Sequence, residues 1–137
     1  MSAIPSDSEV GGAWTAYVLG ELFDKWPRRL DFNALDVASV TISPRNDPEE
    51  LFDDLFNWLN ANGYIHIGQD AGEGHALLVS LTNQGFSILG QKPKGFEQPL
   101  GRKLKTAAAA IGSQTGGAVI SELIGTMVGA ASKQFFA

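Results

Sequence analysis

The chain has 137 residues, a formal net charge of -5 at pH 7 and no cysteine. This length suits one domain, or one small domain with an appendage, and a hydrophobic content of 44% with 18% charged residues is typical of a folded protein. The lack of cysteine excludes disulfides, thiolate metal sites and cysteine nucleophiles, and the acidic balance opposes non-specific binding to nucleic acids.

Residues 1–12 are rich in Ser, Pro, Asp and Gly, which predicts a flexible leader. They contain neither the basic nor the apolar region of a secretory signal, so we expect a cytoplasmic protein, with membrane association as an open alternative. Residues 14–26 carry apolar side chains, including Trp14 and Trp26, at helical spacing, and Pro27 stops this helix. Gly20 costs the helix roughly 1 kcal/mol relative to Ala, which favours a close helix contact there.

Residues 30–42 predict a short helix that Asp31 or Asn33 caps, although the β-branched residues also allow a strand over 37–42. A stronger helix signal follows at Asp47. Asp47 caps the helix, Pro48 takes its first position, and acids fill its first turn, where they favour the positive end of the helix dipole. Gly63 is expected to end this helix in the left-handed conformation.

Residues 64–67 and 76–81 predict two strands joined by a glycine-rich turn at 69–74. Thr82 then caps a short helix. Residues 95–106 have the composition of a basic linker, and we place the boundary of the first domain, 13–94, near Lys94.

This order of elements resembles a winged-helix domain. It is similar to the MarR-like and PadR-like regulators, in which one strand is followed by a second strand that runs into a Leu-Thr-x-x-Gly motif at the start of the last helix. Here that motif is Leu81, Thr82 and Gly85. The resemblance implies an α+β fold: a three-helix winged-helix-like domain with a two-stranded wing, followed by a C-terminal Gly/Ala-rich helix. It also implies a DNA-binding helix, but winged helices serve as protein-interaction modules too.

The helix that matches the DNA-reading helix starts at Pro48. It carries acids where the phosphates of a duplex would lie, and their repulsion opposes DNA binding by this helix. The alternatives are a solvated helix start or an acidic interaction face toward a basic protein. The wing offers Gln69, Asp70, Glu73 and His75 rather than bases. The acids of the candidate face are Glu49, Glu50, Asp53 and Asp54.

Basic residues lie elsewhere in the sequence. Lys25, Arg28 and Arg29 lie at the end of the first predicted helix, where we interpret them as compensation of its dipole. If DNA or an anionic surface is bound, the candidate contacts are Arg28, Arg29, Arg45, Arg102, Lys103 and Lys105. Together with a dimer formed by the C-terminal helix, these residues define the alternative of a transcriptional regulator.

Residues 107–137 predict a helix with small residues at every fourth position, similar to a glycine zipper, which lets two helix backbones approach closely. The stripe consists of Ser113, Gly117, Ser121, Gly125 and Gly129. Self-association through this stripe gives a homo-oligomer. Membrane contact through 107–131 is a second interpretation, opposed by Glu122, and a tail packed on its own domain is a third.

No pattern of catalytic residues is present, so we expect no enzyme and no cofactor. His66 and His75 flank two acids without a recognised metal-ligand spacing, which predicts no metal site. Trp14, Trp26 and Trp58 occupy apolar helical positions and are expected in the core. The sequence therefore predicts a non-enzymatic interaction or scaffold module that self-associates through its C-terminal helix.

Overall fold

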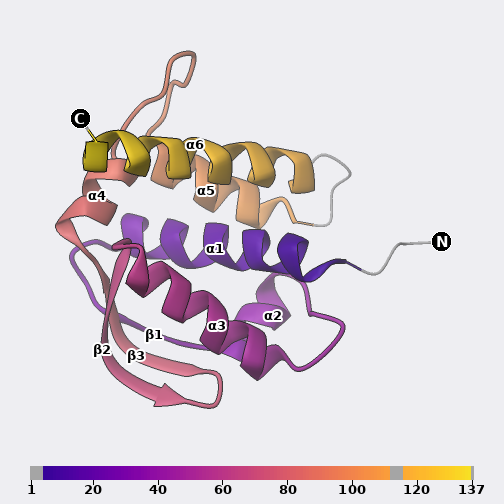
Figure 1. Cartoon of the computed structure of the whole chain (residues 1–137). Coiled ribbons are helices and arrows are strands. Elements are labelled where there is room, and N and C mark those ends of the chain that lie inside the picture. Colours follow the sequence, from indigo (N-terminus) through magenta and orange to yellow (C-terminus); the bar gives the residue numbers. More distant parts are fainter. Residues whose placement is uncertain (1–4, 112–115, 137) are drawn as a thin grey trace.

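The computed structural model describes residues 5–111 and 116–136, which form six helices and a three-stranded antiparallel sheet. The chain therefore has an α+β fold, as predicted. Helix α1 (Asp7–Asp24) runs through the middle of the molecule. Helices α5 (Leu100–Ala109) and α6 (Gly116–Phe136) cover one side of α1, and α2 (Ala34–Val40), α3 (Pro48–Ala61) and the sheet lie on the other (Figure 1).

Helix α1 begins earlier than the composition predicts. Ser6 caps it: the Ser6 hydroxyl accepts a hydrogen bond from the Glu9 amide at 3.1 Å, and the Glu9 side chain completes a capping box. Residues 7–12, predicted as part of a flexible leader, therefore form the first turns of α1. The helix ends at Asp24, so Trp26 and Pro27 lie beyond it.

The central position of α1 follows from its composition, because a helix that is apolar on most sides must be covered on most sides. Trp14, Val18 and Leu19 are fully buried. The Trp14 indole nitrogen donates a hydrogen bond to the Ile42 carbonyl at 2.9 Å, so its polar atom is satisfied. The buried face and the glycines of α1 together let α5 and α6 pack closely against it.

A short strand, β1 (Leu30–Asn33), precedes α2, whereas a helix was expected to start here and a strand was the alternative only for 37–42. Phe32 is buried and Asp31 exposed, which is the alternation of a half-buried strand. Asn33 then caps α2 by accepting a hydrogen bond from the Asp36 amide at 2.9 Å. The sheet is consequently three-stranded, in the order β1-β3-β2, and the prediction of two strands is corrected.

Helix α3 starts as predicted. The Asp47 side chain accepts a hydrogen bond from the Glu49 amide at 2.9 Å, and Pro48 occupies the first turn. Phe52, Phe56 and Leu59 form its buried face. The chain leaves the helix at Gly63, whose φ of +78° confirms the predicted left-handed position.

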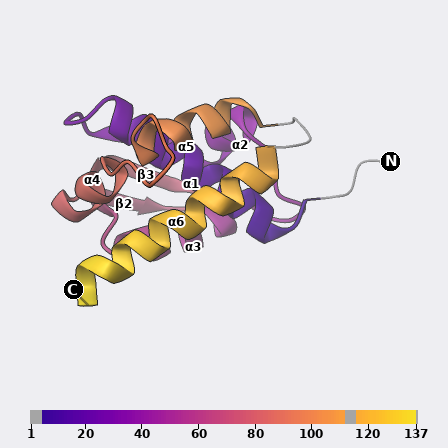
Figure 2. The ribbon, with the colours of Figure 1, turned by 90° about the horizontal axis from the view of Figure 1, so that it is seen from above.

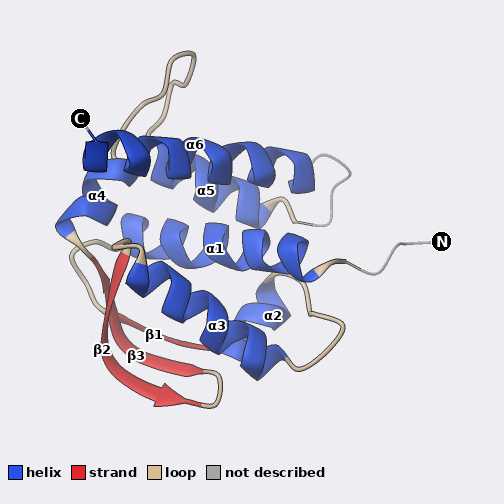
Figure 3. Cartoon of the chain, in the orientation of Figure 1, coloured by secondary structure: helices blue, strands red, loops and turns tan. Residues whose placement is uncertain are grey.

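Strands β2 (Ile65–Gly72) and β3 (His75–Leu81) form a long hairpin at one corner of the molecule (Figure 3). β2 extends through residues 69–72, where a turn was expected, and the reversal is confined to Glu73 and Gly74, both with positive φ. β1 pairs with β3 on the side away from β2, in register Leu30 to Val79. Of the two outer edges of the hairpin, only that of β2 has no neighbouring strand among the described residues.

Helix α4 (Asn83–Leu89) leads into a loop and then into α5, which begins inside the segment predicted as a basic linker. Leu100, Leu104, Ala107 and Ala108 of α5 are buried against the core, so the bases of this segment are the exposed side of an amphipathic helix. Seen from above, α6 crosses the molecule over α3 and ends near α4 (Figure 2). The expected C-terminal helix is thus divided between the end of α5 and α6.

Candidate functional site

The acids of α3 do not form one uniform face. Glu49, Glu50 and Asp54 are exposed, whereas Asp53 is half-buried and accepts a hydrogen bond from the Gly74 amide at 2.9 Å. Gly74 is buried at the tip of the hairpin. A Cβ added to Gly74 would lie 2.9 Å from the Glu49 side chain. Asp53 therefore fastens the hairpin to α3, and the exposed acids alone remain available to a partner.

Two further exposed acids lie beside Glu50 and Asp54: Asp7 at the start of α1 and Asp47, the cap of α3. Asp7, Asp47, Glu50 and Asp54 line one hollow of about 200 Å³. The two ion pairs among the described residues involve none of these four. Carboxylates gathered in this way repel the phosphates of a nucleic-acid backbone.

The hairpin does not bring its two histidines together. His66 pairs with Ser80 and His75 with Gly72, so they lie at different levels of the hairpin, and both are exposed. Within residues 5–111 and 116–136, no three His, Cys, Asp or Glu side chains are arranged to hold a metal ion. The hollow between α3 and the hairpin, about 100 Å³, is below the usual size of a small-molecule site.

The structure separates Arg45 from Arg28 and Arg29. The loop that carries Arg45 lies at the beginning of α1, since Pro44 and Asp7 line the same hollow. Arg28 and Arg29 follow the end of α1, one helix length of 18 residues away, which is roughly 27 Å at 1.5 Å per residue. These three residues, grouped as candidate DNA contacts, therefore cannot meet one short ligand together.

The three bases of α5 that were predicted to contact DNA or an anionic surface differ from one another in their neighbours. The Lys105 ammonium lies 2.7 Å from an Asp24 carboxylate oxygen, and this hydrogen bond and charge lower the pKa of Asp24. The Lys103 ammonium lies over the Phe96 ring, 5.4 Å from its centre. Arg102 is exposed and takes part in neither ion pair of the described residues.

Two of the three tryptophans expected in the core are half-exposed, and sequence reasoning missed them as surface features. Trp26 is 49% exposed and stacks on Phe86 with ring centres 4.3 Å apart. Trp58 is 42% exposed and stacks on Tyr64 at 5.8 Å. The signal for Trp26 was its place between Lys25 and Pro27, because a residue next to a helix-stopping proline need not continue the buried helical face.

Helix α6 covers its own domain with one face and leaves the small residues on another. Ile120, Leu123, Met127 and Ala131 are buried, whereas Ser121, Gly125 and Gly129 are exposed. Neither glycine has another part of the chain within 4 Å of where a Cβ would stand. Of the predicted stripe, Gly117 lies at the start of α6, and Ser113 lies outside the described residues.

Among the helices that the structure describes, none is both long and apolar enough to cross a lipid bilayer. No protein-family model, curated protein or solved structure matches the chain. Three surfaces with distinct chemistry remain as candidates. They are the acidic face (Asp47, Glu49, Glu50, Asp54), the small-residue face of α6 (Ser121, Gly125, Val128, Gly129) and the aromatic-basic edge (Trp26, Arg28, Arg29).

Proposed function

We propose that the chain is a non-enzymatic interaction module of the winged-helix type that pairs with a second copy of itself through the small-residue face of α6. The order of three helices, a hairpin and a closing helix supports the winged-helix class. The short strand β1 adds a third strand to that arrangement without interrupting it. The proposal of pairing depends on how α6 divides its residues between two faces.

The observation that carries the proposal is the uncovered side of α6, on which one valine lies beside two glycines. Val128 is 40% exposed, and it lies on the same side as the open glycines Gly125 and Gly129. The core of the chain is already complete beneath α6, because Leu123 and Met127 are buried there. An exposed valine beside bare backbone is removed from water when another helix covers it, which favours association.

A second copy suits this face because the face is complementary to itself. It contains a projecting side chain, Val128, next to the shallow backbone at Gly125. In a two-fold pair each surface patch meets its own equivalent, so Val128 of each chain would fill the space beside Gly125 of the other. Small residues allow the close helix approach that such packing needs.

The acidic face is the surface for which we propose a basic protein partner. Its exposed carboxylates attract Lys and Arg side chains and repel phosphates. The alternative is a transcriptional regulator that binds DNA through Arg28, Arg29, Arg45 and the bases of α5, and the separation of Arg45 from Arg28 and Arg29 along α1 opposes it. Titration with duplex DNA across salt separates the two, because a regulator shows a steep, sequence-dependent response.

Pairing through α6 is tested by sedimentation of the full chain at several concentrations. We expect the wild type to exceed the mass of one chain, and Gly125→Leu/Gly129→Leu to weaken association at least about tenfold, because two bulky side chains separate the backbones. The matched control is Gly11→Leu. Gly11 also lies in a helix with open space where its Cβ would stand, and this change should leave association intact.

Two results would refute the proposed pairing. One is a wild-type chain that sediments as a single copy at concentrations of about 100 μM, where even a weak dimer of this kind forms. The other is a Gly125→Leu/Gly129→Leu variant that associates as well as Gly11→Leu. In the second case the chain pairs, but α6 does not provide the interface.

A further inference from the structure

The edge formed by Trp26, Arg28 and Arg29 combines two features. It has an aromatic ring exposed at the surface and cations that belong to neither ion pair of the described residues. From this combination we propose that the aromatic-basic edge binds single-stranded nucleic acid, with one base stacked on Trp26 and the flanking phosphates held by Arg28 and Arg29.

The ring of Trp26 is held in place from one side. Phe86 of α4 stacks against it at 4.3 Å with an angle of 26° between the planes, and Phe86 also contacts Phe23 at 5.8 Å. Phe86 covers one side of the indole, and Trp26 as a whole is still 49% exposed. A ring that is fixed and partly exposed is a platform for another flat aromatic group, and a nucleic-acid base is such a group.

Four cations stand against three carboxylates near this platform, and two of the carboxylates are in ion pairs with lysines. Glu21 pairs with Lys25 at 2.6 Å, and Asp24 pairs with Lys105 at 2.7 Å. Asp31 of β1 accepts a hydrogen bond from the Leu78 amide at 2.8 Å. The guanidinium groups of Arg28 and Arg29 are exposed and belong to neither ion pair of the described part of the chain.

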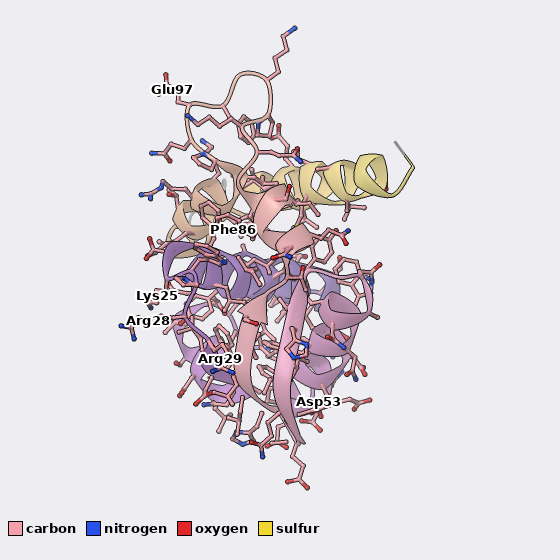
Figure 4. The ribbon with its side chains drawn as sticks, turned by 90° about the vertical axis from the view of Figure 1, so that its left-hand side faces the viewer. Lys25, Arg28, Arg29, Asp53, Phe86 and Glu97 are labelled. Carbon is pink, nitrogen blue, oxygen red and sulfur yellow. The ribbon has the colours of Figure 1, made fainter. Side chains whose placement is uncertain are left out.

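The arrangement is visible from the side on which α1 ends (Figure 4). In this view Lys25 and Arg28 lie at the left edge, Arg29 lies below them and further in, Phe86 lies above, and Asp53 lies at the lower right. Arg28 follows Lys25 closely in the turn, where its amide donates a hydrogen bond to the Lys25 carbonyl at 2.9 Å. Trp26 is placed beside these cations by its stacking on Phe86 and by its position in the chain between Lys25 and Arg28.

A single strand fits this edge better than a duplex or an acidic protein. In a duplex the bases are already stacked on one another and cannot lie on Trp26. A peptide of Asp and Glu alone would satisfy the arginines but offers no aromatic group to the ring of Trp26. Stacking and phosphate binding together are the usual means by which proteins hold single strands without sequence preference.

The chain provides a matched comparison in its second half-exposed tryptophan. Trp58 also stacks on one aromatic neighbour, Tyr64, but it lies on α3 with the exposed acids Glu50 and Asp54. The two tryptophans differ in the charge around them rather than in exposure. Only Trp26 should therefore respond to a single strand.

The experiment measures tryptophan fluorescence of the full chain during titration with oligodeoxythymidine of about ten nucleotides, within the usual site size for such proteins. We expect quenching that Trp58→Phe preserves and Trp26→Phe abolishes. Anisotropy of a labelled strand gives the affinity, which Trp26→Leu should lower by roughly 5- to 150-fold, as expected for the loss of one stacked base. Trp58→Leu should leave the affinity unchanged.

The arginines are tested separately, so that an unstable tryptophan variant does not decide the result. Arg28→Ser/Arg29→Ser changes two exposed side chains outside the ion pairs of the described residues. It should reduce the slope of log affinity against log salt by about 0.7 for each phosphate that an arginine no longer neutralises. Arg45→Ser removes an exposed cation at the other end of α1 and is the control for net charge. This control should change the slope far less.

Three outcomes would overturn the proposal. The first is an absence of quenching in the Trp58→Phe protein, because Trp26 is then not stacked by the bound strand. The second is equal affinity for polyglutamate of the same length, which would show that charge alone is recognised. The third is tighter binding of the duplex than of the single strand, which would exclude base stacking on Trp26.

Discussion

Gly20 of α1 faces the backbone of Lys105 in α5, and a Cβ on Gly20 would lie 2.7 Å from the Lys105 Cα. Such a close approach cannot be relieved by turning a side chain, because the Lys105 backbone is fixed in its own helix. The sequence predicted a close helix contact at Gly20 from the cost of a glycine inside a helix, and this prediction is confirmed. The contact joins α5 to the centre of the molecule.

Replacement of Gly20 by alanine should therefore destabilise the protein. In an open helix the change gains roughly 1 kcal/mol from helix propensity, but here the added methyl group forces α1 and α5 apart, at a cost of about 1–3 kcal/mol. We expect Gly20→Ala to lower the free energy of unfolding in urea and Gly11→Ala, which has open space, to raise it. Equal effects of the two changes would contradict the proposed steric role of Gly20.

The features that the sequence predicted well are those set by neighbouring residues. The start of α3 depends on Asp47 and Pro48, and the end of α3 depends on Gly63, all within one local stretch. The cap of α4 by Thr82 is of the same kind. Such signals need no knowledge of the rest of the fold, because capping bonds and left-handed turns form within a few residues.

The features that were missed depend on residues far apart in the chain. Leu30 becomes part of a strand because it pairs with Val79 of β3, and no residue close to Leu30 in the sequence indicates that pairing. Trp26 is held at the surface by Phe86 of α4. Helix α5 is an exception, because its helical spacing is local: Leu100 and Leu104 are four residues apart, but the basic residues around them favoured the interpretation as a linker.

The candidate surfaces also combine features that are readable from neighbouring residues with features that depend on the fold. The sequence identified the small residues of α6, but only packing shows that Gly125 and Gly129 face outward while Leu123 and Met127 cover the domain. The acids of α3 were also identified, but the role of Asp53 as an acceptor for Gly74 depends on the position of the hairpin.

Asp53 and its neighbour Asp54 should consequently differ in their effect on stability. In Asp53→Ala the buried amide of Gly74 loses its acceptor, which costs about 1–3 kcal/mol. In Asp54→Ala an exposed side chain is shortened, and we expect a change within about 0.5 kcal/mol. Urea unfolding measures both, and faster hydrogen exchange at Gly74 in Asp53→Ala alone would locate the effect. If both variants lose similar amounts of unfolding free energy, the removal of a negative charge from the helix is the cause, and the loss of the hydrogen bond to the hairpin is not.

Thr82 joins the end of α3 to the start of α4 through its hydroxyl group. This hydroxyl donates to the Gly63 carbonyl at 2.6 Å and accepts from the Gly85 amide at 2.8 Å. Thr82→Val keeps the shape of the side chain but removes both bonds, and we expect a loss of about 1–2 kcal/mol in urea unfolding, as for other helix caps. Thr82→Ser keeps the hydroxyl and should retain most of the stability. If serine is no better than valine, the hydroxyl is not the cause.

The pair between Asp24 and Lys105 should make stability depend on pH in acid. The Lys105 ammonium lowers the pKa of Asp24 below its ordinary value of 3.8, so the folded protein holds this carboxylate ionised more strongly than the unfolded chain does. The resulting stability is fully present above about pH 4 and is lost as the pH falls through the lowered pKa of the folded state. We expect the urea midpoint of the wild type to fall more steeply in this window than that of Asp24→Asn.

Two further variants separate the pair from the general effect of removing an acid. Asp54→Asn removes an exposed carboxylate outside both ion pairs of the described residues, and it should not reproduce the change seen with Asp24→Asn. Lys105→Gln should reproduce it, because Asp24 then loses the charge that lowers its pKa. The pair is exposed, so salt should reduce the difference between Asp24→Asn and the wild type. An unchanged acid profile in Lys105→Gln would show that Lys105 does not control the titration of Asp24.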